Sequence, residues 1–167
     1  MATKRAASTR GSADRARRIA AKHRKLRAHA EALIERYLRV AGFKEPSDLK
    51  DGGAYHLDTG EVEGFATVRT LEGDLVYTVA AEVLPLPSDQ DLVVPLMREL
   101  LEINSWARGP VRLAIVGDSV WAGISDLVEL MPDDDFGRYV DATVGMAQGL
   151  AGELTKKYGK TSRKRKA

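Results

Sequence analysis

The order of hydrophobic patterns along this chain predicts an α+β fold, in which helices pack on a mainly antiparallel, five-stranded sheet. Two observations lead to this class. Apolar residues recur with helical spacing at the start, the middle and the end of the chain, and the stretches between them alternate as strands do. Short turns join the strand candidates, which favours antiparallel pairing. The predicted order is therefore helix, three strands, helix, two strands, helix.

A first helix is predicted over residues 13–41, between Ser12 as its N-cap and Gly42 as its stop. Its second half repeats apolar residues at spacings of three and four, at Leu26, Ala30, Leu33, Tyr37 and Ala41. Its first half is basic and has few large apolar side chains, so we expect it to project beyond the core or to lie on its surface. Residues 1–12 have no apolar periodicity and are predicted to be a disordered basic tail.

Three strands are predicted after a loop at residues 46–53. Their ranges are 55–59, 62–70 and 75–84. Gly64 weakens the second strand, because glycine has no side chain to pack. The third strand is the strongest, because its alternate residues from Leu75 to Val83 form one apolar face.

The second helix is predicted to begin at a capping box of Ser88 and Asp91 and to end near Ile103, where Asn104 can adopt the left-handed conformation. Pro95 is awkward inside this helix, so its regular part is expected to begin at Val94 or Pro95.

Two further strands and a last helix complete the predicted domain. The strands cover residues 111–116 and 120–130, around a turn at Gly117-Asp118. The helix begins at Pro132 and runs to about Tyr158. Residues 160–167 are predicted to be a second disordered basic tail, which leaves a single domain at residues 13–159.

Charge is sorted by position, although the net charge of the whole chain is only +2. Residues 1–30 contain ten Lys or Arg and one acid, and residues 156–167 contain seven and none. Residues 31–155 contain nine bases and twenty-three acids, a net charge of −14. The chain is thus an acidic body between two basic ends, a distribution that affects the choice of partner.

The second half of the chain resembles the type III secretion chaperone-like superfamily, and especially its YbjN branch. The segments that carry the resemblance are LMRELLEIN at Leu96–Asn104, VRLAIVGDSVWAGISDL at Val111–Leu127, and a long last helix that ends in KKYG. The resemblance covers about residues 30–158 and is most specific over 92–158. It implies a compact α+β domain that often forms homodimers, binds other proteins, and uses no cofactor. The two basic ends depart from the family pattern, and Ile103 stands where leucine is usual.

No catalytic, cofactor or metal site is predicted. Gly117-Asp118-Ser119 resembles a motif of some esterases, but the hairpin turn explains these residues and no histidine has a suitable context. His23 and His29 are six residues apart, so they do not form the i, i+4 pair of a zinc helix. Asp133–Asp135 suit a helix N-terminus better than a calcium loop. We therefore expect a protein that is not an enzyme.

The candidate residues for protein binding or dimerisation are Leu101, Trp106, Trp121 and Gly123. Trp121 shares a strand face with Gly123 and Ser125, and small neighbours beside a large ring could form a shallow groove. The alternative is that Trp121 belongs to the core under a helix. Trp106 is expected to follow the second helix in a loop and to cap the core.

The basic ends have three interpretations: they neutralise phosphate groups of a nucleic acid without sequence preference, they bind the acidic body or an acidic partner, or they only affect solubility. The candidate phosphate-binding residues are Arg15, Arg17, Arg18, Lys22, Arg24, Lys25, Lys156, Lys157, Lys160, Arg163, Lys164, Arg165 and Lys166.

The sequence as a whole favours a chaperone-like or adaptor-like protein that forms a homodimer and binds a basic or amphipathic segment of another protein. Nucleic-acid binding through the basic ends is the alternative. The absence of cysteine fits a cytoplasmic location. No apolar stretch reaches the roughly 18–20 residues that span a bilayer, so no membrane span is expected.

Overall fold

The structure is a computed structural model that describes residues 3–42, 50–51, 53–131 and 135–159, with side chains from Asp14 onward except that of Lys50. The elements in chain order are α1 (Thr3–Val40), β1 (Lys50–Asp51), β2 (Ala54–Asp58), β3 (Glu63–Leu71), β4 (Asp74–Pro85), α2 (Gln90–Trp106), β5 (Arg112–Val116), β6 (Ser119–Leu127), the short 3₁₀ helix η2 (Val128–Leu130) and α3 (Asp135–Tyr158).

The strands form one antiparallel sheet in the order β1-β2-β3-β4-β6-β5. The predicted α+β class and element order are confirmed, and the five predicted strands are β2 to β6. The two-residue strand β1 is an addition, and it lies in the segment that the sequence predicts as a loop. The last strand ends at Leu127, because the chain turns there into η2.

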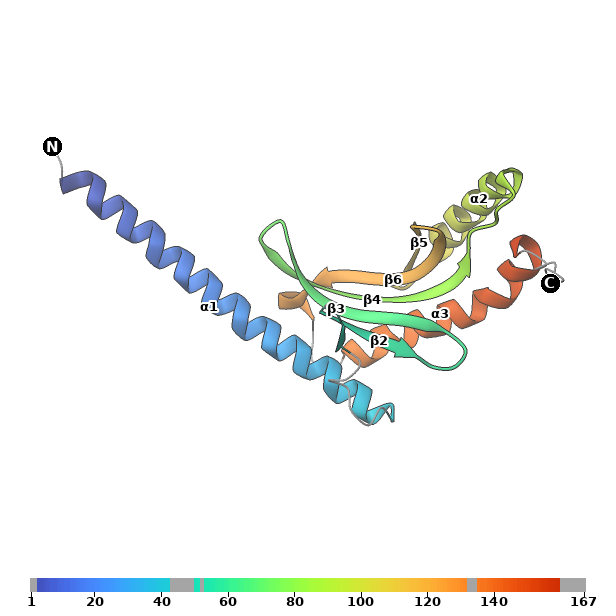
Figure 1. Ribbon diagram of the computed structural model, residues 1–167, viewed down its shortest axis with the longest axis horizontal. Coiled ribbons are helices and arrows are strands. Elements are labelled where there is room, and N and C mark those ends of the chain that lie inside the picture. The colour runs from blue at the N-terminus through green and yellow to red at the C-terminus, as the bar shows by residue number, and fades with distance from the viewer. Residues whose placement is uncertain (1–2, 43–49, 52, 132–134, 160–167) are drawn as a thin grey trace, which may run out of the picture.

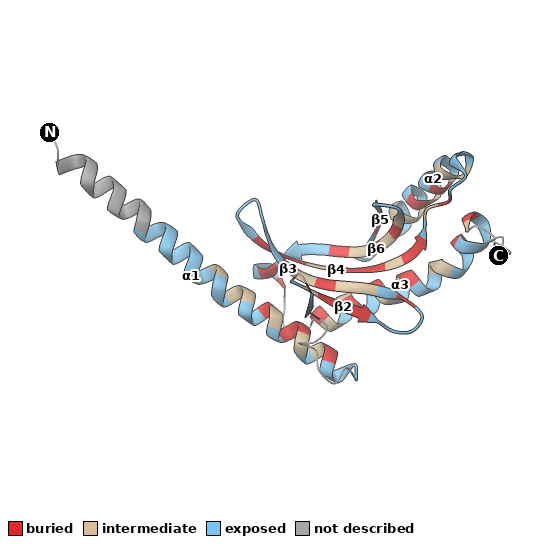
Figure 2. Ribbon diagram, in the orientation of Figure 1, coloured by how far each residue is buried: buried red, intermediate tan, exposed pale blue. Residues whose placement is uncertain are grey.

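Two helices cover one face of the sheet, and the third lies beside its end. α3 runs under β4 and β6, and α1 packs against β3, β4 and α3 (Figure 1). α2 packs beside the terminal strand β5. The predicted apolar face of β4 is buried against the helices, and so are Ala30, Leu33 and Leu38 of α1 (Figure 2).

The first helix begins at Thr3, so the predicted start after Ser12 is wrong, and the chain is helical from there instead of disordered over 1–12. Gly11 lies inside this added part of the helix. Glycine costs a helix about 1 kcal/mol, which the alanine, lysine and arginine residues of the same segment offset. The basic first half of α1 leaves the body of the molecule and is exposed from Asp14 to Ala21, which confirms the predicted projection.

The ends of α2 also differ from the prediction. Asp89 is the N-cap, and its carboxylate accepts a hydrogen bond from the Asp91 backbone N–H at 3.1 Å, so the capping box of Ser88 and Asp91 does not form. The helix continues through Pro95 to Trp106, since proline removes only one backbone hydrogen bond there. Asn104 therefore does not stop the helix.

The hairpin turn predicted at Gly117 is present, and a second tight turn joins β3 to β4. Glu72 and Gly73 have positive φ angles of 51° and 97° between β3 and β4, and Gly117 has a φ of 60° between β5 and β6. Pro132, the predicted start of the last helix, lies outside the described residues, as do residues 160–167. In the described ranges no helix is long and apolar enough to cross a bilayer, and no cluster of potential metal ligands is found.

Candidate protein-binding face

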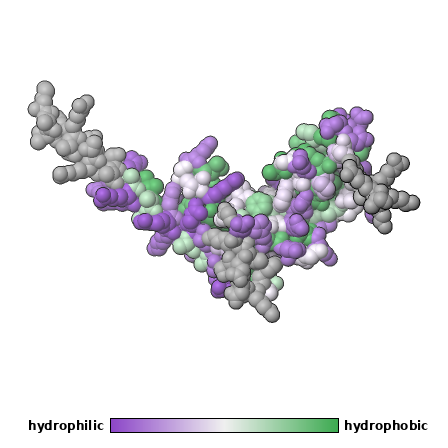
Figure 3. All heavy atoms as spheres, viewed as in Figure 1, coloured by the Kyte–Doolittle hydropathy of each residue, from purple (hydrophilic) through white to green (hydrophobic). Residues whose placement is uncertain are grey.

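The face of the sheet opposite α1 and α3 carries a groove of about 580 Å³. Because β4 is buried on its helix side at Leu75, Tyr77 and Val79, the side chains of Thr78 and Ala80 point the other way. The groove is lined by Phe65, Arg69, Thr78, Ala80, Pro110, Arg112, Ala114, Val116, Gly117, Trp121, Gly123, Ile124 and Ser125. The surface is hollowed between the β3–β4 hairpin and the end of the sheet that holds β5 and α2 (Figure 3).

Trp121 is half-buried in this groove, and its ring contacts Phe65 with the ring centroids 5.5 Å apart. The interpretation that Trp121 lies in the core under a helix is wrong, because α3 covers the other side of the sheet. The prediction that Trp121, Gly123 and Ser125 share one groove is confirmed as geometry. Its role in binding stays a prediction.

The floor of the groove is built from small residues. Gly123 pairs with Ala80 of β4, which pairs in turn with Phe65 of β3. A Cβ atom at Gly123 would lie 3.1 Å from the carbonyl oxygen of Val79 and 3.4 Å from the Ala80 Cβ. Glycine at this position therefore keeps the floor low beside the two aromatic rings.

An apolar stripe on α2 is the second exposed surface near a strand edge. Val94, Met97 and Leu101 recur at helical spacing and are all exposed, Leu101 at 69%. Beside them, a small cavity of about 210 Å³ lies between α2 and β5. Leu101 is thus a surface residue of the kind the sequence analysis expected at an interface, whereas Trp121 and Gly123 lie in the separate groove.

Asn104 has a role that its place in the sequence does not indicate. Its side-chain amide donates to the carbonyl of Leu113 at 2.9 Å, and its side-chain oxygen accepts from the Leu113 N–H at 2.8 Å. Leu113 lies in β5, the terminal strand of the sheet, and its other neighbour is β6. One side chain therefore satisfies both backbone groups at the middle of an edge strand, where an added strand would otherwise bind.

Trp106 lies in the last turn of α2 and is 83% exposed. The prediction that it follows the helix in a loop and caps the core is therefore wrong. It lines a cavity of about 750 Å³ between α2 and the end of α3. Below it, Glu99 accepts hydrogen bonds from Lys157 at 2.7 Å and from the Tyr158 hydroxyl at 2.5 Å. These two bonds lower the pKa of the Glu99 carboxyl, and the bond to Glu99 raises the pKa of Lys157. Lys157 is therefore already paired with a carboxylate of the same chain.

The candidate phosphate-binding residues are not brought together. Arg15, Arg17, Arg18, Arg24 and Lys25 are exposed on the projecting half of α1, and Lys156 is exposed at the far end of the molecule (Figure 1). Lys22 forms an ion pair of 2.7 Å with Glu129. The remaining candidates, Lys160, Arg163, Lys164, Arg165 and Lys166, lie outside the described residues.

Comparison with solved structures identifies the fold. A chain of the ExsC–ExsE complex matches with a TM-score of 0.60 and 15% identity, covering 77% of this chain and 95% of its own. A chain of the HopA1–SchA chaperone–effector complex matches with a TM-score of 0.52 and 12% identity, covering 74% and 93%. YbjN from E. coli matches with a TM-score of 0.49 and 18% identity, covering 74% and 89%.

The chain therefore shares the fold of the matching chains of the ExsC–ExsE and HopA1–SchA complexes, and the resemblance found in its sequence is confirmed at the level of the fold. No protein-family model matches the chain, and no curated protein matches it significantly.

Proposed function

We propose that this protein is a chaperone-like or adaptor-like module, without enzymatic activity, that binds a segment of another protein in the groove around Trp121. The observation that carries the proposal is the groove itself. It is an exposed, aromatic-walled groove on the sheet face that α1 and α3 leave open. Exposed grooves with large aromatic side chains are typical of protein-binding surfaces.

The fold comparisons support a protein partner. One matching chain belongs to a chaperone–effector complex and another to a complex of two proteins, ExsC and ExsE. The same fold here, with an open groove, is suited to holding a partner segment by shape and apolar burial. A cytoplasmic location belongs to this proposal, as the cysteine-free sequence suggests.

Trp121→Ala is expected to weaken partner binding by about 30-fold, because large aromatic side chains at the centre of an interface contribute about 2 kcal/mol or more. The test is a pull-down from the natural host with the full chain as bait, followed by mass spectrometry. Leu130→Ala is the matched control, since Leu130 is 66% exposed and does not line the groove. Recovery of the same proteins by the wild type and by Trp121→Ala would show that the groove is not the binding site.

The exposed stripe on α2 is the proposed homodimer contact. Val94, Met97 and Leu101 lie beside the protected edge of β5, where Asn104 blocks pairing by a further strand. Two copies can therefore meet through helix packing at this end, while the groove on the sheet face stays open. A two-fold contact of this kind places the same residues on both sides.

Leu101→Glu is expected to convert the dimer into a monomer, because it would place two carboxylates in an apolar, self-complementary contact. Sedimentation equilibrium measures the mass over a range of concentrations. Leu130→Glu adds the same charge at an exposed leucine on η2 and is expected to leave the dimer intact. A wild-type protein that is monomeric at every concentration would contradict the proposal.

Phosphate binding by the basic ends is the alternative function. Arg15, Arg17, Arg18 and Arg24 are exposed on a helix that leaves the body, which suits backbone contacts of a nucleic acid. Lys22 and Lys157, however, are paired with Glu129 and Glu99. The fold comparisons do not bear on nucleic acid, so this alternative stays a prediction.

A further inference from the structure

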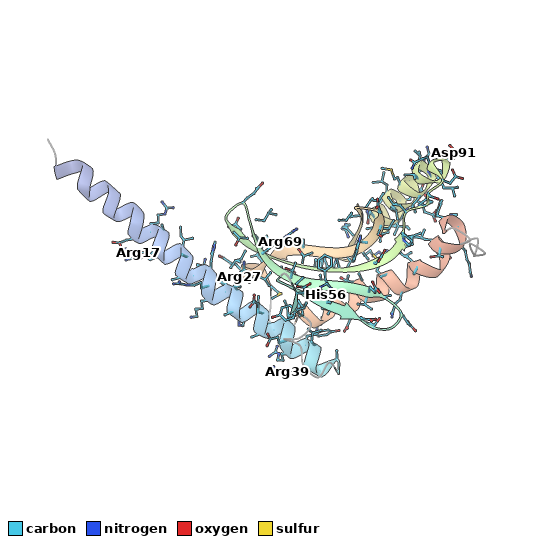
Figure 4. The ribbon with its side chains drawn as sticks, viewed as in Figure 1. Arg17, Arg27, Arg39, His56, Arg69 and Asp91 are labelled. Carbon is cyan, nitrogen blue, oxygen red and sulfur yellow. The ribbon has the colours of Figure 1, made fainter. Side chains whose placement is uncertain are left out.

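The groove around Trp121 has an apolar end and a polar end. At the polar end Thr78 and Ser125 are cross-strand neighbours, and their hydroxyl oxygens are 2.9 Å apart. Arg69 and Arg112 line the groove from β3 and β5, on either side of this hydroxyl pair. Figure 4 shows Arg69 above the sheet, on the side away from α3.

The register of the sheet fixes where the arginines lie. Arg69 pairs with Val76, which is two residues before Thr78 in β4. Arg112 pairs with Gly123, which is two residues before Ser125 in β6. Arg112 therefore starts in the same row as Gly123, one pleat from the hydroxyl pair, and Arg69 starts one pleat from that pair on its other side. Both side chains lie on the groove face of the sheet.

The charge at this end is opposite to that of the body. The charged residues among those that line the groove are Arg69 and Arg112, and no carboxylate is among them. Arg69 has no ion-pair partner in the part of the chain that the structure describes, and Arg112 donates to the carbonyl oxygens of Val111, at 2.8 Å, and Gly109. Glu82 lies on this face but pairs with Trp121 at the other end. The Ser125 hydroxyl also donates to the carbonyl oxygen of Tyr77 at 3.3 Å, so the two arginines, rather than the hydroxyl groups, are the groups that suit a carboxylate.

The apolar end lies one pleat further along the same strands. Gly123 and Ala80 form its floor, and Phe65 and Trp121 form its walls. Gly123 precedes Ser125 by two residues, so the centres of the two ends are about 6.5–7 Å apart along the strand. Side chains i and i+2 of an extended peptide have the same spacing, and both point to one side.

We propose that the groove binds an extended protein segment that carries an apolar side chain and, two residues away, an aspartate or glutamate. The apolar side chain packs over Gly123 against the rings of Phe65 and Trp121, which contact each other, and the carboxylate binds Arg69 and Arg112 over the hydroxyl pair. This assignment rests on the proposed protein-binding function of the groove and specifies which kind of segment binds there. The acidic body as a whole favours a basic or amphipathic partner, but the groove itself selects an amphipathic segment with a carboxylate.

The test uses three blocked peptides, Gly-Ser-Leu-Thr-X-Ser-Gly, in which X is glutamate, glutamine or lysine. The protein is the full chain with Trp106→Phe, which leaves Trp121 as its one tryptophan, since the chain contains two. Trp121 fluorescence then reports binding in the groove. The glutamate peptide is expected to bind about tenfold more tightly than the glutamine peptide, as hydrogen bonds to a charged group contribute more than neutral ones. The lysine peptide is expected to bind most weakly.

The double variant Arg69→Gln and Arg112→Gln tests the arginines. It should bind the glutamate and glutamine peptides with equal affinity, and its affinity for the glutamine peptide should match that of the wild type. Arg108→Gln is the matched control, because Arg108 is exposed and does not line the groove. Equal binding of all three peptides would overturn the carboxylate preference while the groove function stands. Absence of any fluorescence change, together with pull-down results that do not depend on Trp121, would overturn both.

Discussion

Gly64→Ala is expected to destabilise the protein by about 3 kcal/mol, at the upper end of the cost of overpacking a well-packed interior. Gly64 lies inside β3 and pairs with Ala81 of β4. A Cβ atom there would lie 2.5 Å from the carbonyl oxygen of Ala80 and 3.3 Å from the Ala81 Cα. These are backbone atoms of the central strand, so they can move only by distorting the pairing of β3 with β4. Urea unfolding followed by circular dichroism measures the loss.

Gly149→Ala is the matched control for this substitution and is expected to stabilise the protein by about 1 kcal/mol, the usual difference between alanine and glycine in a helix. Gly149 lies inside α3, and a Cβ atom there would meet nothing within 4 Å. The two variants make the same chemical change in opposite surroundings. Equal stability of Gly64→Ala and the wild type would show that the sheet adapts at no cost.

Asn104→Ala is expected to lower the free energy of unfolding by about 2 kcal/mol, because two backbone groups of Leu113 lose their hydrogen-bond partners. The same change exposes the edge of β5, so the variant should also aggregate more readily than the wild type. Chemical unfolding measures the first effect, and light scattering at rising concentration measures the second.

Ser105→Ala is the control for the loss at position 104. Ser105 is the next residue of α2, and its hydroxyl bonds to the carbonyl of Glu102 in the preceding turn, at 2.7 Å and exposed to solvent. Removal of this local bond should leave the stability within about 0.5 kcal/mol of the wild type. If Asn104→Ala were no less stable than Ser105→Ala, the pairing with Leu113 would not matter to the fold.

The fold class could be predicted because its determinants are local. The period of the apolar residues, the turn at Gly117 and the strong alternation of β4 are all properties of short segments. The alternation of side chains along β6 likewise places Trp121 and Gly123 on one face of the sheet. The helix start near Thr3 was missed because ordinary helix formers without apolar periodicity resemble a disordered tail in sequence.

The rest of the candidate site depends on which strands are neighbours, and no short segment contains that information. Phe65 meets Trp121 because β4 lies between β3 and β6, so two residues far apart in sequence share one groove. Arg69 and Arg112 approach one patch for the same reason. Its sequence context predicts Asn104 to be a helix stop, because the bond to Leu113 exists only once α2 lies beside β5.

The projecting half of α1 holds positive charge away from the body of the molecule. Its exposed arginines lie at one end, outside a body whose sequence is strongly acidic (Figure 1). A charged partner that approaches this helix is oriented by its field before contact. Because salt shortens the reach of this field to about 8 Å at physiological ionic strength, the orienting effect is greatest in dilute buffer.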